Sequence, residues 1–116
     1  AGLTATVFKT SAGAVSHLPI VRANLQNVLR VLKESGFWFA GLSVRGTENL
    51  FSANLKGCRL ALLIGAESRD ISPSLQKHCD WLLQIPMWGK VNSLNASNAA
   101  AVAMYEVRRQ QTSSHR

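Results

Sequence analysis

The chain has 116 residues, enough for one domain with a single core, and its 47% hydrophobic content argues against extensive disorder. Thirteen Lys and Arg against six Asp and Glu give a net charge of +7 and a pI near 10.3, which favours a polyanionic partner such as RNA. No apolar run approaches the roughly 20 residues of a membrane span and no signal peptide opens the sequence, so we expect a soluble protein of the cytoplasm or, in a eukaryote, of an organellar matrix.

The basic residues are scattered, and only Arg108 and Arg109 are adjacent. Charge alone therefore leaves open a generic basic surface and a nucleic-acid-binding face. Cys58 and Cys79 match no metal-ligand spacing and the three histidines are isolated, so we expect reduced thiols and no metal. No serine has a histidine at a meaningful position, and the P-loop and dinucleotide spacings are missing.

The first predicted elements are two short strands. Residues 6–9 alternate weakly and predict a strand, and the small residues 10–14 predict a turn. Residues 18–21 form a second apolar run, in which Pro19 favours an edge position or the start of a strand.

A helix, a buried strand and a loop are expected next. Asn24 can cap a helix whose apolar residues recur every three or four positions: Leu25, Val28, Leu29 and Leu32. Gly36 supplies the left-handed residue that ends it. Residues 37–44 are nearly all apolar and predict a strand that is covered on both faces. Residues 45–57 are polar, lack a period, and predict a loop with at most one helical turn.

The second half continues the alternation of strands and helices. The expected elements are a strand over residues 59–64, a short helix over 75–79, a strand over 81–85 and a helix over 96–110. Ser72 and Pro73 provide the N-cap and the first helical position of the short helix. The sequence therefore predicts an α/β fold with a mostly parallel sheet and helices on both faces.

Three predicted turns could form a ligand site at one edge of this sheet. Gly65 ends one strand, Ile85 ends the next, and residues 93–95 open the last helix. In a parallel sheet these turns meet at the carboxyl edge, where open α/β sheets bind ligands. Backbone groups there could hold an adenosyl base, with Ile85, Met87 and Leu94 stacked around it. The alternative is that these are tight turns that only cap the core.

Several short motifs follow one another along the chain in a fixed order. They are Lys9-x-Ser11-x-Gly13-Ala14, Gly65-x-Glu67, Ile85-Pro86-Met87, Gly89, Ser93-Leu94-Asn95-Ala96-Ser97, Ala99-Ala100 and Glu106-x-x-Arg109-Gln110. Their order resembles that of the SpoU-type (TrmH-like) RNA ribose 2′-O-methyltransferases of the SPOUT superfamily. Within that family the chain looks most like the enzymes that methylate guanosine of 23S ribosomal RNA.

The resemblance implies a cofactor, S-adenosylmethionine, and residues that bind it. The backbones around Gly65, Ile85 and Leu94 would hold the cofactor, with Met87 beside them. It also implies a trefoil knot in which the last helix passes through the cofactor loop. A homodimer through that helix and the cofactor loops is implied as well, together with an RNA substrate, ribosomal rather than transfer RNA.

The resemblance also implies two catalytic roles, and the chain departs from the family's pattern in two places. Asn95 would position the catalytic groups, and Glu67 would brace its turn. The family continues Gly-x-Glu with Gly-x-Gly, whereas Asp70 stands here at the last glycine. If that position needs positive φ, Asp70 costs about 1 kcal/mol or more and adds a negative charge. We therefore expect a weakened cofactor affinity or a rebuilt loop.

The second departure concerns the family's first motif, Asn-x-Gly-x-x-x-Arg, which would precede Ala1 on an opening strand-helix-strand segment. Its arginine is thought to help deprotonate the ribose hydroxyl. Residues 1–111 thus correspond to the C-terminal portion of a methyltransferase domain, and residues 112–116 to a flexible tail. A rival hypothesis is a non-catalytic RNA-binding or dimerisation module with the same fold. A third is a flavodoxin-like nucleotide-binding domain, which only the alternating pattern supports.

Overall fold

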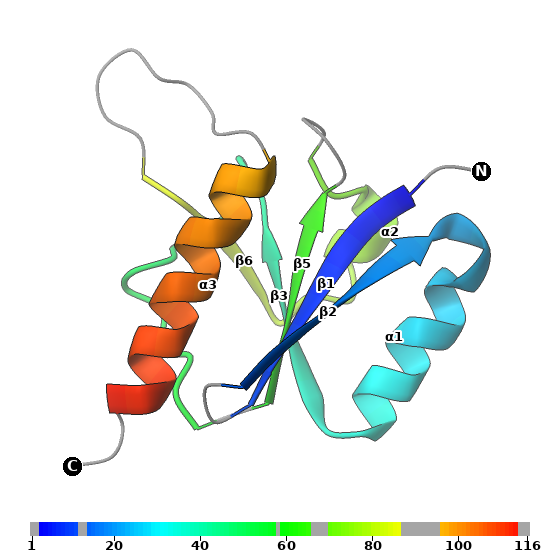
Figure 1. The fold of residues 1–116 in the computed structure, drawn as a ribbon. Helices are drawn as coiled ribbons and strands as arrows, with labels where there is room; N and C mark the ends of the chain where they lie inside the picture. Colours follow the sequence, from blue (N-terminus) through cyan, green and yellow to red (C-terminus); the bar gives the residue numbers. More distant parts are fainter. Residues whose placement is uncertain (1–2, 12–13, 58, 66–69, 87–95, 114–116) are drawn as a thin grey trace.

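The computed structural model describes residues 3–11, 14–57, 59–65, 70–86 and 96–113, and in these residues one six-stranded sheet carries helices on both faces (Figure 1). The strands are β1 (Leu3–Ser11), β2 (Ala14–Val21), β3 (Phe37–Leu42), β4 (Glu48–Asn49), β5 (Arg59–Gly65) and β6 (Trp81–Gln84). The helical elements are the 3-10 helix η1 (Arg22–Asn24), α1 (Leu25–Glu34), α2 (Pro73–Gln76) and α3 (Ala96–Ser113).

The sheet has the order β2-β1-β5-β3-β6-β4 and contains a parallel and an antiparallel part. Strands β5, β3, β6 and β4 run parallel to one another. Strands β1 and β2 form a hairpin, and β1 also pairs antiparallel with β5. The predicted α/β sheet with helices on both faces is confirmed. The hairpin makes the sheet mixed, because a connection of two residues is too short for a parallel crossover.

Strand β2 lies at the edge of the sheet, as Pro19 suggested. Pro19 pairs with Thr6 of β1, and its missing N–H is tolerated at a free edge. The strand begins at Ala14, four residues before the predicted apolar run. Residues 14–19 are exposed, so they show no apolar pattern that could have indicated the longer strand.

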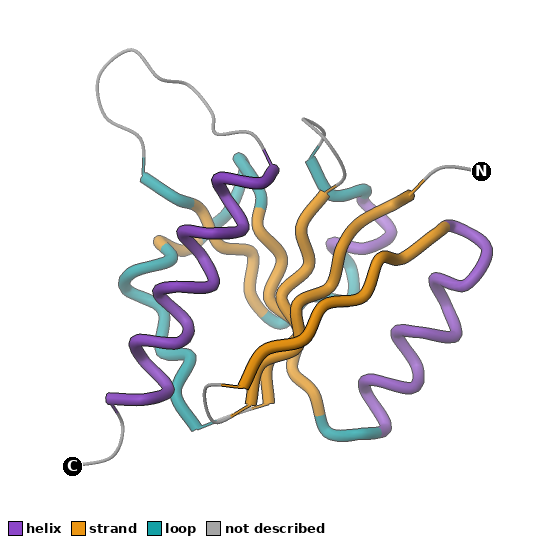
Figure 2. The backbone as a smooth tube through the Cα atoms, in the orientation of Figure 1, coloured by secondary structure: helices purple, strands orange, loops and turns teal. Residues whose placement is uncertain are grey.

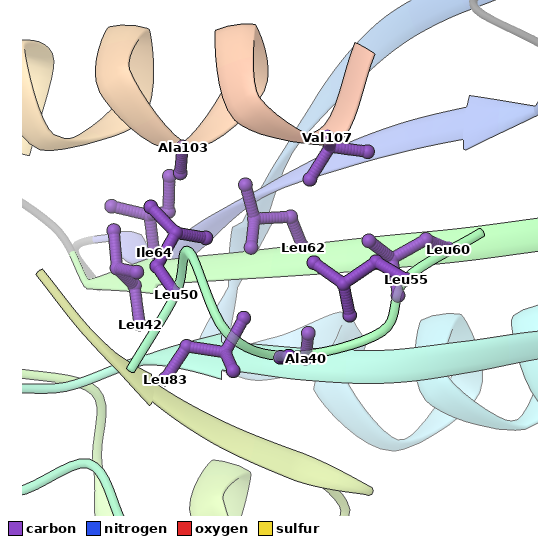
Figure 3. Packing of buried hydrophobic residues seen from close by; sticks show 11 residues of the cluster. Ala40, Leu42, Leu50, Leu55, Leu60, Leu62, Ile64, Leu83, Ala103 and Val107 are labelled. Atoms are coloured by element: carbon purple, nitrogen blue, oxygen red, sulfur yellow. The ribbon is translucent and has the colours of Figure 1, made fainter. Parts of the chain in front are cut away.

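Strand β5 is the centre of the core, because it is covered on both faces. Leu60, Leu62 and Ile64 face the cluster that includes Ala103 and Val107 of α3 (Figure 3). The intervening residues Ala61 and Leu63 face the opposite cluster, which contains side chains of α1 and α2. Burying one leucine side chain stabilises a fold by about 2 kcal/mol. The continuous apolar run of β5 therefore holds helices against both sides of the sheet.

The stop of α1 and the start of α2 follow the predicted signals, whereas the cap of α1 differs and α2 ends at Gln76, three residues before its predicted end. Gly36 has φ of +86° directly after α1, which confirms the predicted stop. Ser72 Oγ accepts a hydrogen bond from the Leu75 N–H at 3.4 Å, so it caps α2 as expected. The prediction for Asn24 was wrong: its Oδ1 accepts from the Val21 N–H at 3.2 Å and closes η1, and it makes no cap bond to α1.

Among the described residues, no helix is both long and apolar enough to cross a lipid bilayer.

The predicted loop over residues 45–57 contains the short strand β4, and Gly46 packs closely against β6. A Cβ atom at Gly46 would lie 2.5 Å from the carbonyl carbon of Leu83 and 2.7 Å from the nitrogen of Gln84. Only glycine allows this approach, which brings the loop that follows β3 across the end of β6. Strand β4 was not predicted because two residues cannot show a period of two.

The C-terminal half of α3 is fixed to the segment that precedes β5. Gln110 Oε1 accepts from the Leu55 N–H at 2.8 Å, and Gln110 Nε2 donates to the Ala53 carbonyl at 3.0 Å and to Glu106 Oε2 at 2.7 Å. Arg109 donates to both oxygens of Glu106, at 2.8 and 2.9 Å. The Arg109 hydrogen bond, helped by Gln110, holds the pKa of Glu106 below its ordinary value although burial opposes this.

We predict that Gln110→Leu lowers the free energy of unfolding by about 1–3 kcal/mol, because the buried groups of residues 53 and 55 lose these bonds. Chemical denaturation measures the change. Arg108→Gln is the matched control, because Arg108 is exposed on the same helix and should change stability by no more than about 0.5 kcal/mol. Equal stabilities of the two variants would contradict the anchoring role of Gln110.

The low pKa of Glu106 makes stability depend on pH in a defined direction. A carboxylate whose pKa is lower in the folded than in the unfolded protein stabilises the fold at pH values above its unfolded pKa, here the ordinary 4.5. That stabilisation is lost as the pH falls through the pKa of the folded state. We expect the Glu106→Gln variant to lose less stability than the wild type when the pH is lowered from 6 to below the ordinary pKa of 4.5. Thermal unfolding at a series of pH values measures the difference. A Glu106→Gln variant that loses stability as steeply as the wild type in acid would contradict this role of Glu106.

Candidate functional site

The carboxyl ends of β5, β3 and β6 lie along one edge of the sheet (Figure 2). Ile64 of β5 and Leu83 of β6 pair with Leu42 of β3 from opposite sides. Gly65 and Ile85, which follow these two residues closely, therefore leave the sheet at the same edge with β3 between them. The structure thus places two of the residues that the sequence predicted to bind a cofactor at the same edge, separated by β3.

The surroundings of these two residues are largely apolar. Gly65 is buried, has no side chain, and pairs with Ala5 at the start of β1. Ile85 is half-buried and packs against the core cluster that also contacts α3. Main-chain groups at Gly65 and the apolar surface of Ile85 are the kinds of contact that hold an adenosyl group.

Four other predicted site residues are not in the described part of the chain. They are Glu67, Met87, Leu94 and Asn95, which belong to residues 66–69 and 87–95. The predicted threading of the last helix concerns the same segments. These roles, and the knot, stay predictions. The described helix α3 begins at Ala96, directly after the predicted catalytic Asn95.

Asp70, which stands at the family's second glycine, has a defined partner. Its Oδ2 accepts a hydrogen bond from the Ser43 hydroxyl at 2.9 Å, and its Oδ1 accepts from the Ile71 N–H at 3.1 Å. Ser43 is buried, and its Oγ also accepts from the Arg45 N–H at 3.0 Å. Asp70 therefore joins the segment before α2 to the loop after β3. Ser43 was not predicted, because it is 27 residues away and carries no local signal.

A cavity of about 430 Å³ lies beside this link. Arg22 from η1, Arg45 from the loop after β3, and Asp70 are among the residues that line it. Neither arginine was predicted as a site residue, because the two come from separate elements of the chain. They would have been found only by knowing which strands end at this edge.

The described cysteine does not add a nucleophile to the site. Burial and, as the smaller cause, the nearby Asp80 together raise the pKa of the Cys79 thiol to about 12. Its Sγ lies 3.4 Å from the Leu75 carbonyl as a hydrogen-bond donor. Among the residues that the structure describes, no three His, Cys, Asp or Glu side chains gather as metal ligands would.

We predict that Ser43 and Asp70 are energetically coupled. A double-mutant cycle with Ser43→Ala and Asp70→Asn should give a coupling free energy of about 1 kcal/mol from unfolding curves. As a control, Ser43→Ala combined with Asn54→Ala should give additive changes, because Asn54 is exposed at the opposite edge of the sheet. Additivity of the Ser43 and Asp70 changes would show that the link contributes nothing to stability.

Curated relatives with similar sequences are named as RNA methyltransferases. A Synechocystis protein named as an uncharacterized tRNA/rRNA methyltransferase is 48% identical over 111 residues, which cover 95% of this chain and 29% of that protein. A Bacillus subtilis protein named as a TrmH-family tRNA/rRNA methyltransferase is 44% identical over 110 residues, covering 93% of this chain and 43% of that protein. The chain thus spans less than half the length of these relatives.

Solved structures with the same fold are named in the same way. The SpoU methyltransferase AviRb from Streptomyces viridochromogenes matches with a TM-score of 0.69 and 29% identity over 82% of this chain and 37% of that one. Its complex with AdoMet matches with a TM-score of 0.64 and 30% identity, covering 77% and 36% of the two chains. An A. aeolicus TrmH/SpoU tRNA modifying enzyme matches with a TM-score of 0.62 and 29% identity, covering 74% and 43%.

A family model also matches most of the chain. The matched residues are 1–105, and the model describes the SpoU rRNA methylase family. This match, the similar relatives and the shared fold agree with one another. The chain belongs to the SpoU rRNA methylase family.

Proposed function

We propose that the protein that contains this chain transfers a methyl group from S-adenosylmethionine to a ribose 2′-hydroxyl of RNA, with a guanosine of ribosomal RNA as the substrate. The observation that carries the proposal is the position of Gly65 and Ile85 at one carboxyl edge in a member of the SpoU family. A structural neighbour, AviRb, is a methyltransferase in complex with AdoMet, which supports the choice of cofactor. The net charge of +7 suits an RNA substrate.

The residues at the edge fit a cofactor that is held mainly by the main chain. Gly65 presents no side chain at the end of β5, and Ile85 offers an apolar contact on the other side of β3. Met87 and Leu94 are proposed to complete the apolar contacts. When bound, the sulfonium of the cofactor supplies an activated methyl group and leaves as a neutral thioether.

The protein then has to orient and deprotonate the attacking hydroxyl. The 2′-oxygen forms a bond to the methyl carbon while the carbon–sulfur bond breaks, and the hydroxyl proton passes to a base. We assign Asn95 to positioning these groups and Glu67 to bracing the turn after Gly65. The deprotonating arginine of the family's first motif would come from a segment that precedes residue 1.

A homodimer and a trefoil knot are part of the same proposal. Tyr105 on α3 is 76% exposed, and an exposed aromatic side chain on a helix suits a protein interface. We therefore propose that α3 and the cofactor loops form the dimer contact. The compartment proposed is the cytoplasm or, in a eukaryote, an organellar matrix.

One observation favours a second candidate, a non-catalytic RNA-binding or dimerisation module. Asp70 places a carboxylate next to the proposed cofactor edge, and its bond to Ser43 holds it there. A fixed negative charge in a cofactor turn could lower the affinity for the cofactor. The module would keep the RNA-binding surface and the fold but would show no methyl transfer.

We predict that the natural protein binds S-adenosylmethionine in calorimetry and transfers a labelled methyl group to bulk ribosomal RNA. Gly65→Val should abolish binding, because a branched side chain occupies the backbone approach. Asn95→Ala should leave binding nearly intact and lower turnover by about 100-fold or more. Thermal unfolding checks that Gly65→Val remains folded, and the milder Gly65→Ala should give an intermediate affinity if the fold of the valine variant fails.

The control variant is Asn54→Ala, which removes an exposed asparagine at the opposite edge and should match the wild type in both assays. Equal losses of binding and turnover in the Gly65 and Asn95 variants would mean that their roles are misassigned. RNA binding without any cofactor binding or methyl transfer would favour the non-catalytic module.

A further inference from the structure

The cavity beside the Ser43–Asp70 link adjoins the edge proposed for the cofactor. Its volume of about 430 Å³ lies within the range of small-molecule sites. Leu3 and Thr4 line it, and the next residue, Ala5, pairs with Gly65. A molecule in this cavity would therefore lie next to the end of β5, where the methyl donor is proposed to bind.

The charges that line the cavity favour an anion. Arg22 and Arg45 are both exposed, and neither forms an ion pair or a side-chain hydrogen bond with any residue in the described ranges. The carboxylate of Asp70 is engaged by the Ser43 hydroxyl and the Ile71 N–H. The N–H donors of both guanidinium groups thus remain free to bind a phosphate, for which arginine geometry is well suited.

The wall of the cavity that α2 forms is held by core packing and by its own hydrogen bonds. Ile71 and Leu75 are buried in the core, and Ser72 Oγ caps the helix by accepting from the Leu75 N–H. Gln76 Nε2 donates to the Ile71 carbonyl at 2.9 Å. These bonds hold the wall in place, so a ligand would enter a cavity that is largely formed in advance.

We propose that this cavity binds one nucleotide of the substrate RNA strand, with its phosphate held between Arg22 and Arg45. The inference rests on the proposed function, because it takes the nucleotide to be part of the RNA that is methylated. The cavity has room for a nucleoside in addition to a phosphate, and proteins commonly read RNA by accommodating nucleotides that are splayed out of a single strand. Its position would bring a ribose close to the cofactor edge.

The test measures binding of small probes to the natural protein. The probes are the four nucleoside 5′-monophosphates, the corresponding nucleosides and inorganic phosphate, each titrated by calorimetry and followed by the amide NMR signals of Ile71 and Gln76. We expect at least one monophosphate to bind more tightly than its nucleoside and than phosphate alone. Arg22→Gln and Arg45→Gln should each weaken that binding by about tenfold or more, the loss expected for a charge-assisted hydrogen bond.

The matched control is Lys56→Gln, which makes the same charge change at an exposed site just before β5, at the opposite edge of the sheet. It should leave the affinity unchanged. The inference is overturned if the arginine variants behave like Lys56→Gln, if nucleosides bind as tightly as monophosphates, or if phosphate alone binds as tightly as every nucleotide.

The outcome is separable from that of the proposed function. Nucleotide binding at Ile71 and Gln76 together with no binding of S-adenosylmethionine would support the nucleotide site and overturn the methyltransferase proposal. Binding of S-adenosylmethionine with no response to any nucleotide would overturn the nucleotide site and support the methyltransferase proposal.

Discussion

The burial of β5 on both faces is the constraint on which the other elements depend. The strand has no polar side chain between Leu60 and Ile64, and all five of these residues are at most 5% exposed. It therefore has to lie inside the sheet, between β1 and β3, with helices on each side. As a result its last residue, Gly65, is placed in the middle of the carboxyl edge, where the neighbouring strand ends can contribute to a common site.

The position of α3 is set by packing along one face and by polar contacts near its end. Ala103 and Val107 pack on the even-numbered residues of β5, and small side chains such as Ala103 let the helix approach the sheet closely. Gln110 then attaches the helix to the segment before β5, and its amide also donates to Glu106, which accepts from Arg109 on the same helix. These three residues belong to the motif at the end of the chain that resembles the family. In the structure they stabilise the fold, and the C-terminal half of α3, to which they belong, lies away from the carboxyl ends of the parallel strands (Figure 1).

The chemistry of the site is shaped by how charges are distributed at the carboxyl edge. The Asp70 carboxylate accepts hydrogen bonds from the Ser43 hydroxyl and the Ile71 N–H, so its negative charge lies beside the loop that follows β3. Arg22 and Arg45 lie around the adjacent cavity without an acidic partner in the described residues. From the sequence, Asp70 was expected only to weaken cofactor binding or to require a rebuilt loop. In the structure it also links two segments of the chain through Ser43. It forms one boundary of a cavity that, among the described residues, is lined by two arginines and one aspartate, a balance that favours an anion.

The sequence by itself determined the buried strands, the glycine that ends α1, the Ser72-Pro73 start of α2, and Gly65 and Ile85 as the ends of two successive strands of the chain. Each of these depends on a pattern that is local in the chain: an apolar run, a residue that tolerates positive φ, or a cap. Only the tertiary structure decided the antiparallel place of the β1–β2 hairpin, the capping of η1 by Asn24, and the pairing of Ser43 with Asp70. It also decided that Arg22 and Arg45 share a cavity and that Gln110 binds a segment 55 residues away. Contacts of this kind join residues that are distant in sequence and polar in character, so no periodicity or spacing in the chain records them.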